Sequence, residues 1–308
     1  MSTILITGGT GLIGSALTKM LTGKGHKVII LTRTQKATVD NNISYAVWNT
    51  KSQKINEEAV ASADYIVHLS GAGVADKRWT SERKKEIVES RQQGGALLVK
   101  ALMQVPNNVK AVISASAIGW YGKDEDRSPK KKAFTEDMGA DKGFLGETCR
   151  LWEESIEPVK DTGKRLVKLR IGIVLSNDGG ALPEFKKPVK FGIAGVLGSG
   201  RQVVSWIHIE DLCRMFIYAI ENESVAGVYN AVAPTPVTNK ELTLLLAQKM
   251  KGRFFVDLHV PAFVLKTMLG EMSTEVLKSA TVSAEKIRSA GFTFLYPSIE
   301  SALDNLIK

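Results

Sequence analysis

Short apolar runs alternate with amphipathic stretches along the first half of the chain. HKVIILTR (26–33), ADYIVHLSG (63–71), VKAVISASA (109–117) and RLVKLRIGIVL (165–175) each read as a buried strand, because apolar side chains follow one another with few polar interruptions. Helical spacing fills most of the intervals between them. This alternation predicts an α/β fold, in which helices cover both faces of a doubly wound parallel sheet.

The pattern loosens beyond residue 170. SNDGGALPEF (176–185), FGIAGVLGSGRQ (191–202) and AVAPTPVT (231–238) are typical of loops or hairpins, and from residue 240 the chain is mostly amphipathic and helical. No flexible linker separates the two parts. We therefore expect residues 1–170 to form the sheet domain. Residues 171–308 are expected to form mainly a smaller C-terminal α/β lobe, with some segments returning to the sheet.

A glycine-rich turn follows the first apolar run, Ile4-Leu5-Ile6, and precedes a helical stretch. Gly9 to Gly14 fits G-x-G-x-x-G, and Gly8 extends it to G-x-x-G-x-x-G. Such a turn lets the backbone approach a pyrophosphate at Gly11 and lets the helix pack on the strand at Gly14. A tight turn without a ligand is the alternative, but the second strand that follows favours dinucleotide binding. The expected contacts to the dinucleotide are Gly8, Thr10, Gly11, Leu12, Ile13 and Gly14.

The end of the second strand indicates which dinucleotide is bound. NAD sites usually place an acidic residue there to hold the ribose 2′-hydroxyl. This chain has Thr32-Arg33 instead, and its next acidic residue is Asp40. A guanidinium forms charge-assisted bonds to a 2′-phosphate, and the Thr32 hydroxyl can add one more. The sequence therefore predicts NADP as the cofactor, with an ordinary surface arginine as the alternative.

Composition limits the location of the protein. The chain has 308 residues, 44% of them hydrophobic, so it can bury a large core. No apolar run approaches the roughly 20 residues of a membrane span, and the N-terminus does not resemble a signal peptide. The two cysteines, Cys149 and Cys213, are typical of a reducing compartment. We therefore expect a cytoplasmic protein.

The charge balance bears on partners. A net charge of +9 favours anionic small molecules or weak, unspecific nucleic-acid contact, and no nucleic-acid-binding module accompanies it. The densest basic run, Lys130-Lys131-Lys132, is expected to be a solvated surface. No metal-ligand spacing occurs along the chain. The expected partner is a small-molecule substrate, which includes nucleotide-linked molecules, without specific nucleic acid or membrane, and the protein is expected to be a monomer or homodimer.

Several motifs resemble those of the extended short-chain dehydrogenase/reductases, the group of the nucleotide-sugar epimerases. These motifs are TGGTGLIG (7–14), HLSG (68–71), SASAIGWYG (114–122) and SWIHIEDL (205–212). The resemblance implies a Rossmann fold that binds NADP and carries a substrate lobe. It also places Leu69, Ser70 and Gly71 at the cofactor.

Longer segments resemble an atypical subgroup described as epimerase family proteins. They are KRWTSERKKEIVESR (77–91), GGALPEF (179–185), GSGRQVVSWIHIEDL (198–212) and the end segment from Val260 to Pro297. The resemblance runs over nearly the whole chain, and the end segment is specific to the subgroup. It implies no known substrate.

The catalytic pair of the wider superfamily is missing. That pair is a tyrosine followed four residues later by a lysine on one helix, where the ammonium lowers the pKa of the phenol. None of the six tyrosines has a lysine at that spacing. Phe144 stands at the tyrosine place and Thr148 at the lysine place, and neither side chain titrates near neutral pH.

Three other residues are candidates for catalysis. Ser116 ends a strand where the family has a serine or threonine, Tyr121 follows shortly after it, and Glu147 lies three residues after Phe144 on the same helix. Each also has a purely structural interpretation: a strand end bonded to backbone, a packed aromatic residue and a solvated helix residue. Arg78 and Trp79 could close over the nicotinamide end of the site, with a structural role as the alternative.

Two functions therefore follow from the sequence. The first is an NADP-dependent oxidoreductase or epimerase-like enzyme that uses an unusual acid/base group. The second is a non-catalytic NADP-binding sensor or interaction protein. The glycine turn and Arg33 suit both equally, whereas the polar strand end and the substrate lobe favour the enzyme.

Overall fold

The computed structural model describes residues 1–37, 40–126 and 132–307 of the chain. Its main feature is an eight-stranded sheet in the order β12-β7-β6-β5-β1-β2-β3-β4, which is parallel except for β4. The predicted α/β class with a Rossmann-like parallel sheet is confirmed. The strands are β1 (Thr3–Thr7), β2 (Lys27–Thr32), β3 (Ile43–Asn49), β4 (Lys54–Ile55), β5 (Tyr65–His68), β6 (Ala111–Ala117), β7 (Arg165–Ile171) and β12 (Gly227–Ala231).

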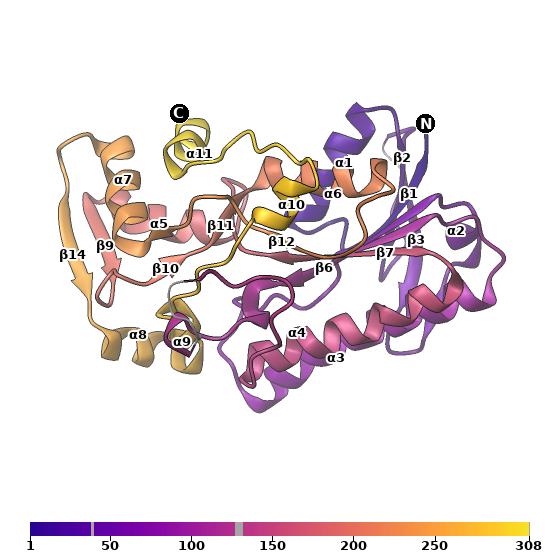
Figure 1. Ribbon diagram of the computed structural model, residues 1–308, viewed down its shortest axis with the longest axis horizontal. Helices are drawn as coiled ribbons and strands as arrows, with labels where there is room; N and C mark the ends of the chain where they lie inside the picture. The colour runs from indigo at the N-terminus through magenta and orange to yellow at the C-terminus, as the bar shows by residue number, and fades with distance from the viewer. Residues whose placement is uncertain (38–39, 127–131, 308) are drawn as a thin grey trace.

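Helices cover both faces of this sheet (Figure 1). Side chains alternate along β1, so that Ile4 and Ile6 join the core beneath one pair of helices and Leu5 joins the core on the other face. The first face carries α1 (Leu12–Gly23) and α6 (Ile209–Glu221). The second carries α2 (Glu57–Ala61), α3 (Ser81–Gln104) and α4 (Phe144–Ile156).

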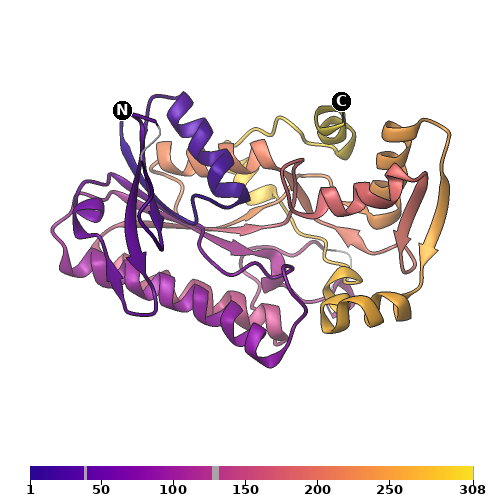
Figure 2. The ribbon, with the colours of Figure 1, turned by 180° about the vertical axis from the view of Figure 1, so that it is seen from behind.

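A smaller unit with its own core extends from one end of the sheet (Figures 1 and 2). Leu182, Trp206 and Leu246 belong to this core. Its strands pair two by two: β8 (Ile173–Leu175) with β11 (Trp206–His208), β10 (Val203–Val204) with β13 (Val237–Thr238), and β9 (Ile193–Leu197) with β14 (Val256–Val260). Its helices are α5 (Ala181–Lys190), α7 (Asn239–Lys251), α8 (Ala262–Leu269), α9 (Ser273–Val276) and α11 (Ile299–Leu306).

The apolar run at residues 165–175 is divided in the structure. A Cβ atom on Gly172 would lie 2.6 Å from the carbonyl oxygen of Ser205, so the chain passes too close to its neighbour for a side chain. The chain leaves the main sheet at this glycine, and β8 pairs with β11 instead of extending β7. The single strand expected from the sequence is therefore two strands in two sheets.

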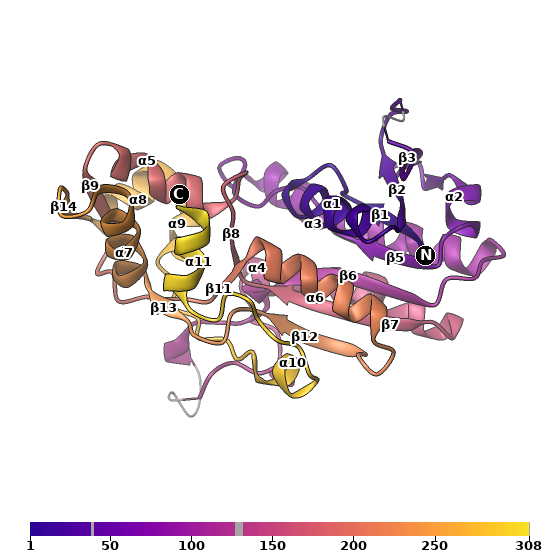
Figure 3. The same cartoon turned by 90° about the horizontal axis from the view of Figure 1, so that it is seen from above.

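The C-terminal segment returns to the main sheet (Figure 3). Ile287, on α10 (Glu285–Ser289), and Phe292 are buried in the same core as α1 and α6. The carboxylate of Asp211 on α6 accepts the N–H groups of Leu295 and Tyr296 at 2.9 and 2.8 Å. These contacts hold residues 285–296 against α6 and the core of the main sheet.

Four short 3-10 helices complete the described structure: η1 (Ile118–Trp120), η2 (Asp124–Asp126), η3 (Glu157–Thr162) and η4 (Gly270–Met272). Of the basic run, Lys130 and Lys131 lie outside the described residues, and Lys132 is exposed. In the part of the chain that the structure describes, none of the helices has the length and apolarity to span a membrane.

Candidate functional site

The carboxyl ends of β1 and β5 meet at the centre of the sheet, where the order of the strands reverses. β1 pairs with β2 on one side and β5 on the other, and Thr7 stands opposite His68 in the β1–β5 register. In open parallel sheets, ligands bind beyond the carboxyl ends of the strands at such a switch point. The glycine turn begins directly after Thr7, so it lies where a ligand is expected.

The glycines of this turn are needed for different reasons. Gly8 has a φ of +71°, and a Cβ atom there would lie 3.0 Å from the backbone of Leu69 and Ser70. A Cβ atom on Gly14 would lie 2.3 Å from the carbonyl oxygen of Gly8, so α1 packs directly on the turn. At Gly11 the protein itself leaves room, since a Cβ atom would meet only that same oxygen at 3.4 Å.

Gly11 is also the N-cap of α1 and supplies no capping side chain. The first N–H groups of a helix lack partners within the helix and carry a partial positive charge, which suits an anion. The open space at Gly11 and the uncapped start of α1 together fit a pyrophosphate group.

The HLSG segment is bonded to β1 through a threonine hydroxyl. Thr7 Oγ1 accepts the N–H groups of Leu69 and Ser70 at 3.1 and 3.2 Å, so its proton is directed to His68 Nδ1 at 2.8 Å. Burial, and to a lesser extent the charge of Arg91, lowers the pKa of His68 to about 4. Nε2 of this neutral ring and Ser70 Oγ are buried without a hydrogen-bond partner among the described residues.

These contacts place the predicted cofactor residues Leu69 and Ser70 against the glycine turn. Gly71 follows them and lies beside the Arg91 guanidinium, whose carbon would be 3.1 Å from a Cβ atom on Gly71. Leu69 to Gly71 therefore lie next to the turn that contains Gly8 to Gly14, although they are distant from it in sequence.

The end of β2 presents a cation at the same edge of the sheet. Arg33 is exposed, and none of the residues from Thr34 to Ala37 is acidic. Thr32 is buried, and its hydroxyl donates to the carbonyl of Thr34 at 2.7 Å. In this conformation the Thr32 proton is not available to a phosphate, whereas the guanidinium of Arg33 is accessible.

Aromatic side chains gather at the start of α4, where the sequence leads us to expect the tyrosine position of the superfamily. Phe144 begins α4, and its ring lies edge-on to Trp79, with 4.9 Å between the ring centroids. Thr148 Oγ1 donates to the carbonyl of Phe144 at 2.6 Å. Lys84 Nζ lies 5.2 Å from the centroid of the Phe144 ring. An ammonium group is thus near this place, although it comes from α3 and not from α4.

The C-terminal segment contacts this aromatic group. Lys84 forms an ion pair with Glu271, and Arg78 lies so close to Gly270 that a Cβ atom there would be 2.7 Å from its Nε atom. Trp79 Nε1 donates to the carbonyl of Val74 at 2.9 Å. The segment after Gly71 is therefore held between α4 and η4.

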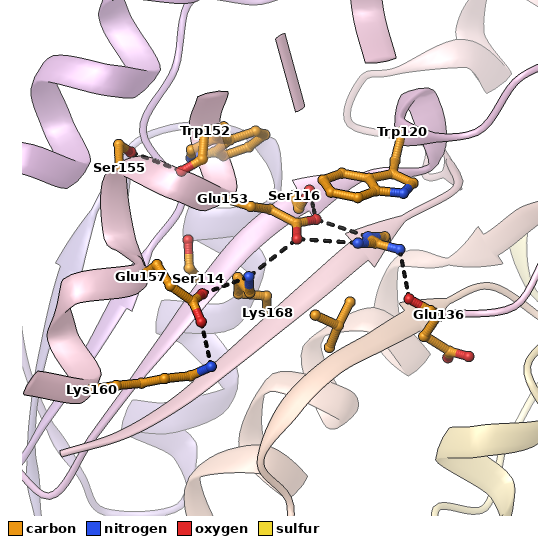
Figure 4. Close-up of polar contacts among 12 residues, drawn as sticks. Ser114, Ser116, Trp120, Glu136, Trp152, Glu153, Ser155, Glu157, Lys160 and Lys168 are labelled. Atoms are coloured by element: carbon orange, nitrogen blue, oxygen red, sulfur yellow. Dashed lines mark hydrogen bonds and ion pairs between the residues drawn. The ribbon is translucent and has the colours of Figure 1, made fainter. Parts of the chain in front are cut away.

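Ser116 belongs to a buried network of charges, shown in Figure 4. Its Oγ atom donates to Glu153 Oε1 at 2.8 Å, and Arg170 donates to both oxygens of the same carboxylate at 2.8 and 3.2 Å. Lys168 Nζ lies 3.2 Å from Glu153, and the Arg170 guanidinium lies 3.7 Å from the centroid of the Trp120 ring. Glu153 and Arg170 were not among the residues predicted from the sequence; the signal was the alternation of Lys168 and Arg170 with apolar residues in the second half of β7.

Tyr121 joins this network, whereas Glu147 does not. The Tyr121 hydroxyl donates to Asn230 Oδ1 at 2.7 Å and accepts a bond from Arg170 at 3.0 Å. Burial raises the pKa of Tyr121 to about 12. Glu147 is on the solvent side of α4, where Arg150 donates to it at 2.8 Å and lowers its pKa. The three candidate catalytic residues are thus not gathered at one point.

Two family models match the chain. The model of the NAD dependent epimerase/dehydratase family matches residues 4–150, and a domain of unknown function, DUF1731, matches residues 260–306. The first range contains the glycine turn, Arg33 and the HLSG segment. The second contains α8 to α10 and the residues that contact Arg78 and Lys84.

Similar proteins match nearly the full length of this chain. The epimerase family protein YfhF of Bacillus subtilis is 36% identical over 99% of this chain and 97% of its own. The crystal structure of the human epimerase family protein SDR39U1 with NADPH is 28% identical, with a TM-score of 0.87 and 99% of both chains covered. A nucleoside-diphosphate sugar epimerase from Corynebacterium glutamicum is 31% identical, with a TM-score of 0.77, over 99% of this chain and 58% of its own.

Proposed function

Because the chain belongs to the epimerase family proteins, an NAD(P)-binding family, we propose that it binds NADP(H) at the carboxyl ends of β1, β2 and β5. The observation that carries the choice of NADP is the accessible guanidinium of Arg33 at the end of β2, with no carboxylate beside it. A carboxylate would repel a 2′-phosphate, whereas arginine binds it in charge-assisted hydrogen bonds. The NADPH in the human SDR39U1 structure supports the same choice.

The residues of this edge suit each part of the cofactor. The open space at Gly11 and the N-terminus of α1 would take the pyrophosphate, and Arg33 would take the 2′-phosphate. Leu69 to Gly71 would line the path toward α4, where NADPH, when bound, supplies a hydride. Thr10, Leu12 and Ile13 complete the turn around the pyrophosphate.

We propose oxidoreductase or epimerase-like chemistry on a small molecule, nucleotide-linked substrates included. The similarity to a sugar epimerase and the presence of a second unit beside the sheet support this reading. Ser116, Tyr121 and Glu147 stay the candidates for proton transfer. For Ser116 or Tyr121 to act, the bonds to Glu153 or Asn230 would have to open, which makes a slow reaction the expectation.

Specific observations favour a second candidate, a non-catalytic NADP-binding sensor. Phe144 and Thr148 stand at the positions that the sequence predicts for the catalytic pair, and the protons of Ser116 and Tyr121 are engaged inside the protein. A buried phenol with a raised pKa is a poor proton donor or acceptor near neutral pH. In this case binding of the cofactor would alter a surface of the protein, and no substrate would be converted.

Fluorescence titration with NADPH and NADH tests the binding proposal, and equal affinities would contradict it. Oxidation of NADPH is then followed against a panel of carbonyl compounds and nucleotide sugars. With any substrate found, Ser116→Ala is expected to lower turnover by about 10²–10⁴ while NADPH affinity holds. Glu147→Gln serves as a comparison on the exposed side of α4. NADPH binding without turnover of any compound would favour the sensor.

A further inference from the structure

The second unit ends in an open strand edge. β14 pairs with β9 in a two-stranded parallel sheet, and no described strand pairs with its other side. Figures 1 and 2 show β14 at the end of the molecule, next to α7 and α8, with no drawn element beyond it. The strand contains no proline, and an unprotected edge of this kind pairs readily with another strand.

The hydrogen-bonding pattern shows which backbone groups face this edge. Val256 N–H donates to Gly192, and the carbonyl of Val260 accepts from Gly198, so alternate residues from Val256 to Val260 bond to β9. Asp257 and His259 therefore direct their N–H and C=O groups outward. Their side chains lie on one face of the strand, and that of Leu258 lies on the other.

The exposed side chains around this edge are unusually apolar. Leu258 is 56% exposed and Phe254, just before the strand, is 88% exposed. Monomeric proteins rarely expose such a group of large apolar side chains without a partner. More than half of the exposed large hydrophobic residues among the described part of the chain belong to this end: Phe191, Ile193, Phe254, Val256, Leu258, Phe263 and Met268.

We propose that two copies of this chain associate by antiparallel pairing of β14 with β14, centred on Leu258. In this register the outward N–H and C=O groups of Asp257 bond to those of His259 of the second copy. His259 bonds in the same way to Asp257 of the second copy, so the two pairs form four backbone hydrogen bonds. Leu258 faces its own copy across the two-fold axis. The result is a continuous four-stranded sheet, β9-β14-β14-β9.

Charge complementarity selects this register. Asp257 lies directly opposite His259 of the second copy, and opposite charges in that position stabilise a strand pair. A shift by two residues would place Asp257 opposite Asp257, or His259 opposite His259. A shift by one would direct the outward groups at residues that are already bonded to β9. Nδ1 of His259 is 2.9 Å from the carbonyl of Gly198, so Nε2 is the ring nitrogen that can face the carboxylate.

The same register also covers the apolar residues. Phe254, just before β14, comes near the start of α8 of the second copy, where Phe263 is exposed. Stable interfaces bury about 1,000 Å² or more, and an aromatic side chain buries about 150–250 Å². Phe254 and Phe263 of both copies would therefore supply about half of the area or more, in addition to the strands.

Cysteine cross-linking tests the pairing directly, because Cys149 and Cys213 are both buried. Leu258→Cys places two thiols opposite each other, so mild oxidation is expected to give a covalent dimer. Val256→Cys is the matched control, since Val256 faces Val260 of the second copy and not itself. Cross-linking of both variants at equal rates, or of neither, would overturn the proposal.

Sedimentation of the full chain gives the second test. The parent is expected to be a dimer, and Asp257→His or His259→Asp alone should raise its dissociation constant by at least about tenfold. The double variant, which exchanges the two residues, should restore dimerisation. Met103→Lys, at an exposed site on α3, is the control and should have no effect. A monomeric parent, or a dimer that the single variants leave intact, would contradict pairing through β14.

Discussion

Thr7 Oγ1 lies 2.8 Å from His68 Nδ1, at the point where β1 and β5 end side by side. Burial keeps the imidazole neutral inside the protein, and this bond helps to hold the HLSG segment against the glycine turn. The ring is fully buried, and its pKa is lowered to about 4.

The first prediction concerns pH. Between pH 4 and 6.5 the unfolded chain binds a proton at His68 that the folded chain does not bind. The contribution of the neutral His68 to the free energy of unfolding is therefore present above pH 6.5 and is lost as the pH falls toward 4. A shift of this size corresponds to at most about 3 kcal/mol. Urea unfolding at several pH values should show a weaker pH dependence in His68→Gln than in the parent. Identical pH dependence in the two proteins would show that His68 does not contribute to it.

The second prediction concerns cofactor choice. Arg33→Ala should remove most of the preference for NADPH over NADH, because charge-assisted bonds contribute about 1.5–3 kcal/mol each, or about tenfold in affinity or more. NADH affinity should change little. Arg253→Ala, an exposed arginine in the second unit, is the control for overall charge. Titration of both cofactors measures the effect, and an unchanged preference in Arg33→Ala would show that another group reads the phosphate.

The third prediction separates two glycines of one turn. Gly11→Val should abolish NADPH binding and leave the free energy of unfolding nearly unchanged, since the backbone of Gly11 has a φ of −82° and its surroundings are open. Gly14→Val should instead destabilise the fold, because its Cβ atom would lie 2.3 Å from a carbonyl oxygen. Thermal unfolding with and without NADPH compares the two. Tight NADPH binding by Gly11→Val would refute the pyrophosphate site.

The fourth prediction concerns the charges beneath Ser116. Glu153→Gln leaves Arg170 and Lys168 buried without their shared carboxylate, which should cost about 3–5 kcal/mol of stability. Ser116→Ala should cost about 1–3 kcal/mol, because one bond to a charged group is lost. Glu147→Gln changes an exposed carboxylate on the same helix and should have little effect. Equal stability of the three variants in urea would mean that the network contributes nothing.

Much of the fold could be predicted, because the central strands are buried on both faces. The runs that became β2, β5 and β6 were recognised for this reason, and the resemblance to the epimerase family proteins is confirmed. β3 was missed because its residues alternate between buried and exposed within a polar region. β14 was missed because its residues, apart from the partly buried Val260, are exposed, so no pattern marks the strand.

The site could be predicted only where its residues form contiguous motifs in the sequence. The glycine turn, Arg33 and the HLSG segment are contiguous motifs, and the structure brings the turn and the HLSG segment into contact. Their roles at a cofactor, and the preference for NADP, stay predictions. The bonds of Ser116 could not be foreseen, because they depend on Glu153 from α4 and Arg170 from β7 meeting in three dimensions.

The return of the C-terminal segment has a consequence for synthesis of the protein. Ile287 and Phe292 fill the same core as Ile4 and Ile6, so this core is closed only after residues 285–292 have been synthesised. At about 5–20 residues per second, translation of the intervening chain takes some tens of seconds. Until residues 285–292 have emerged, the apolar side chains that pack against them stay exposed on the nascent chain. The core of the main sheet therefore closes only after residues 285–292 have emerged from the ribosome, and a chain cut before them would leave the main sheet without part of its cover.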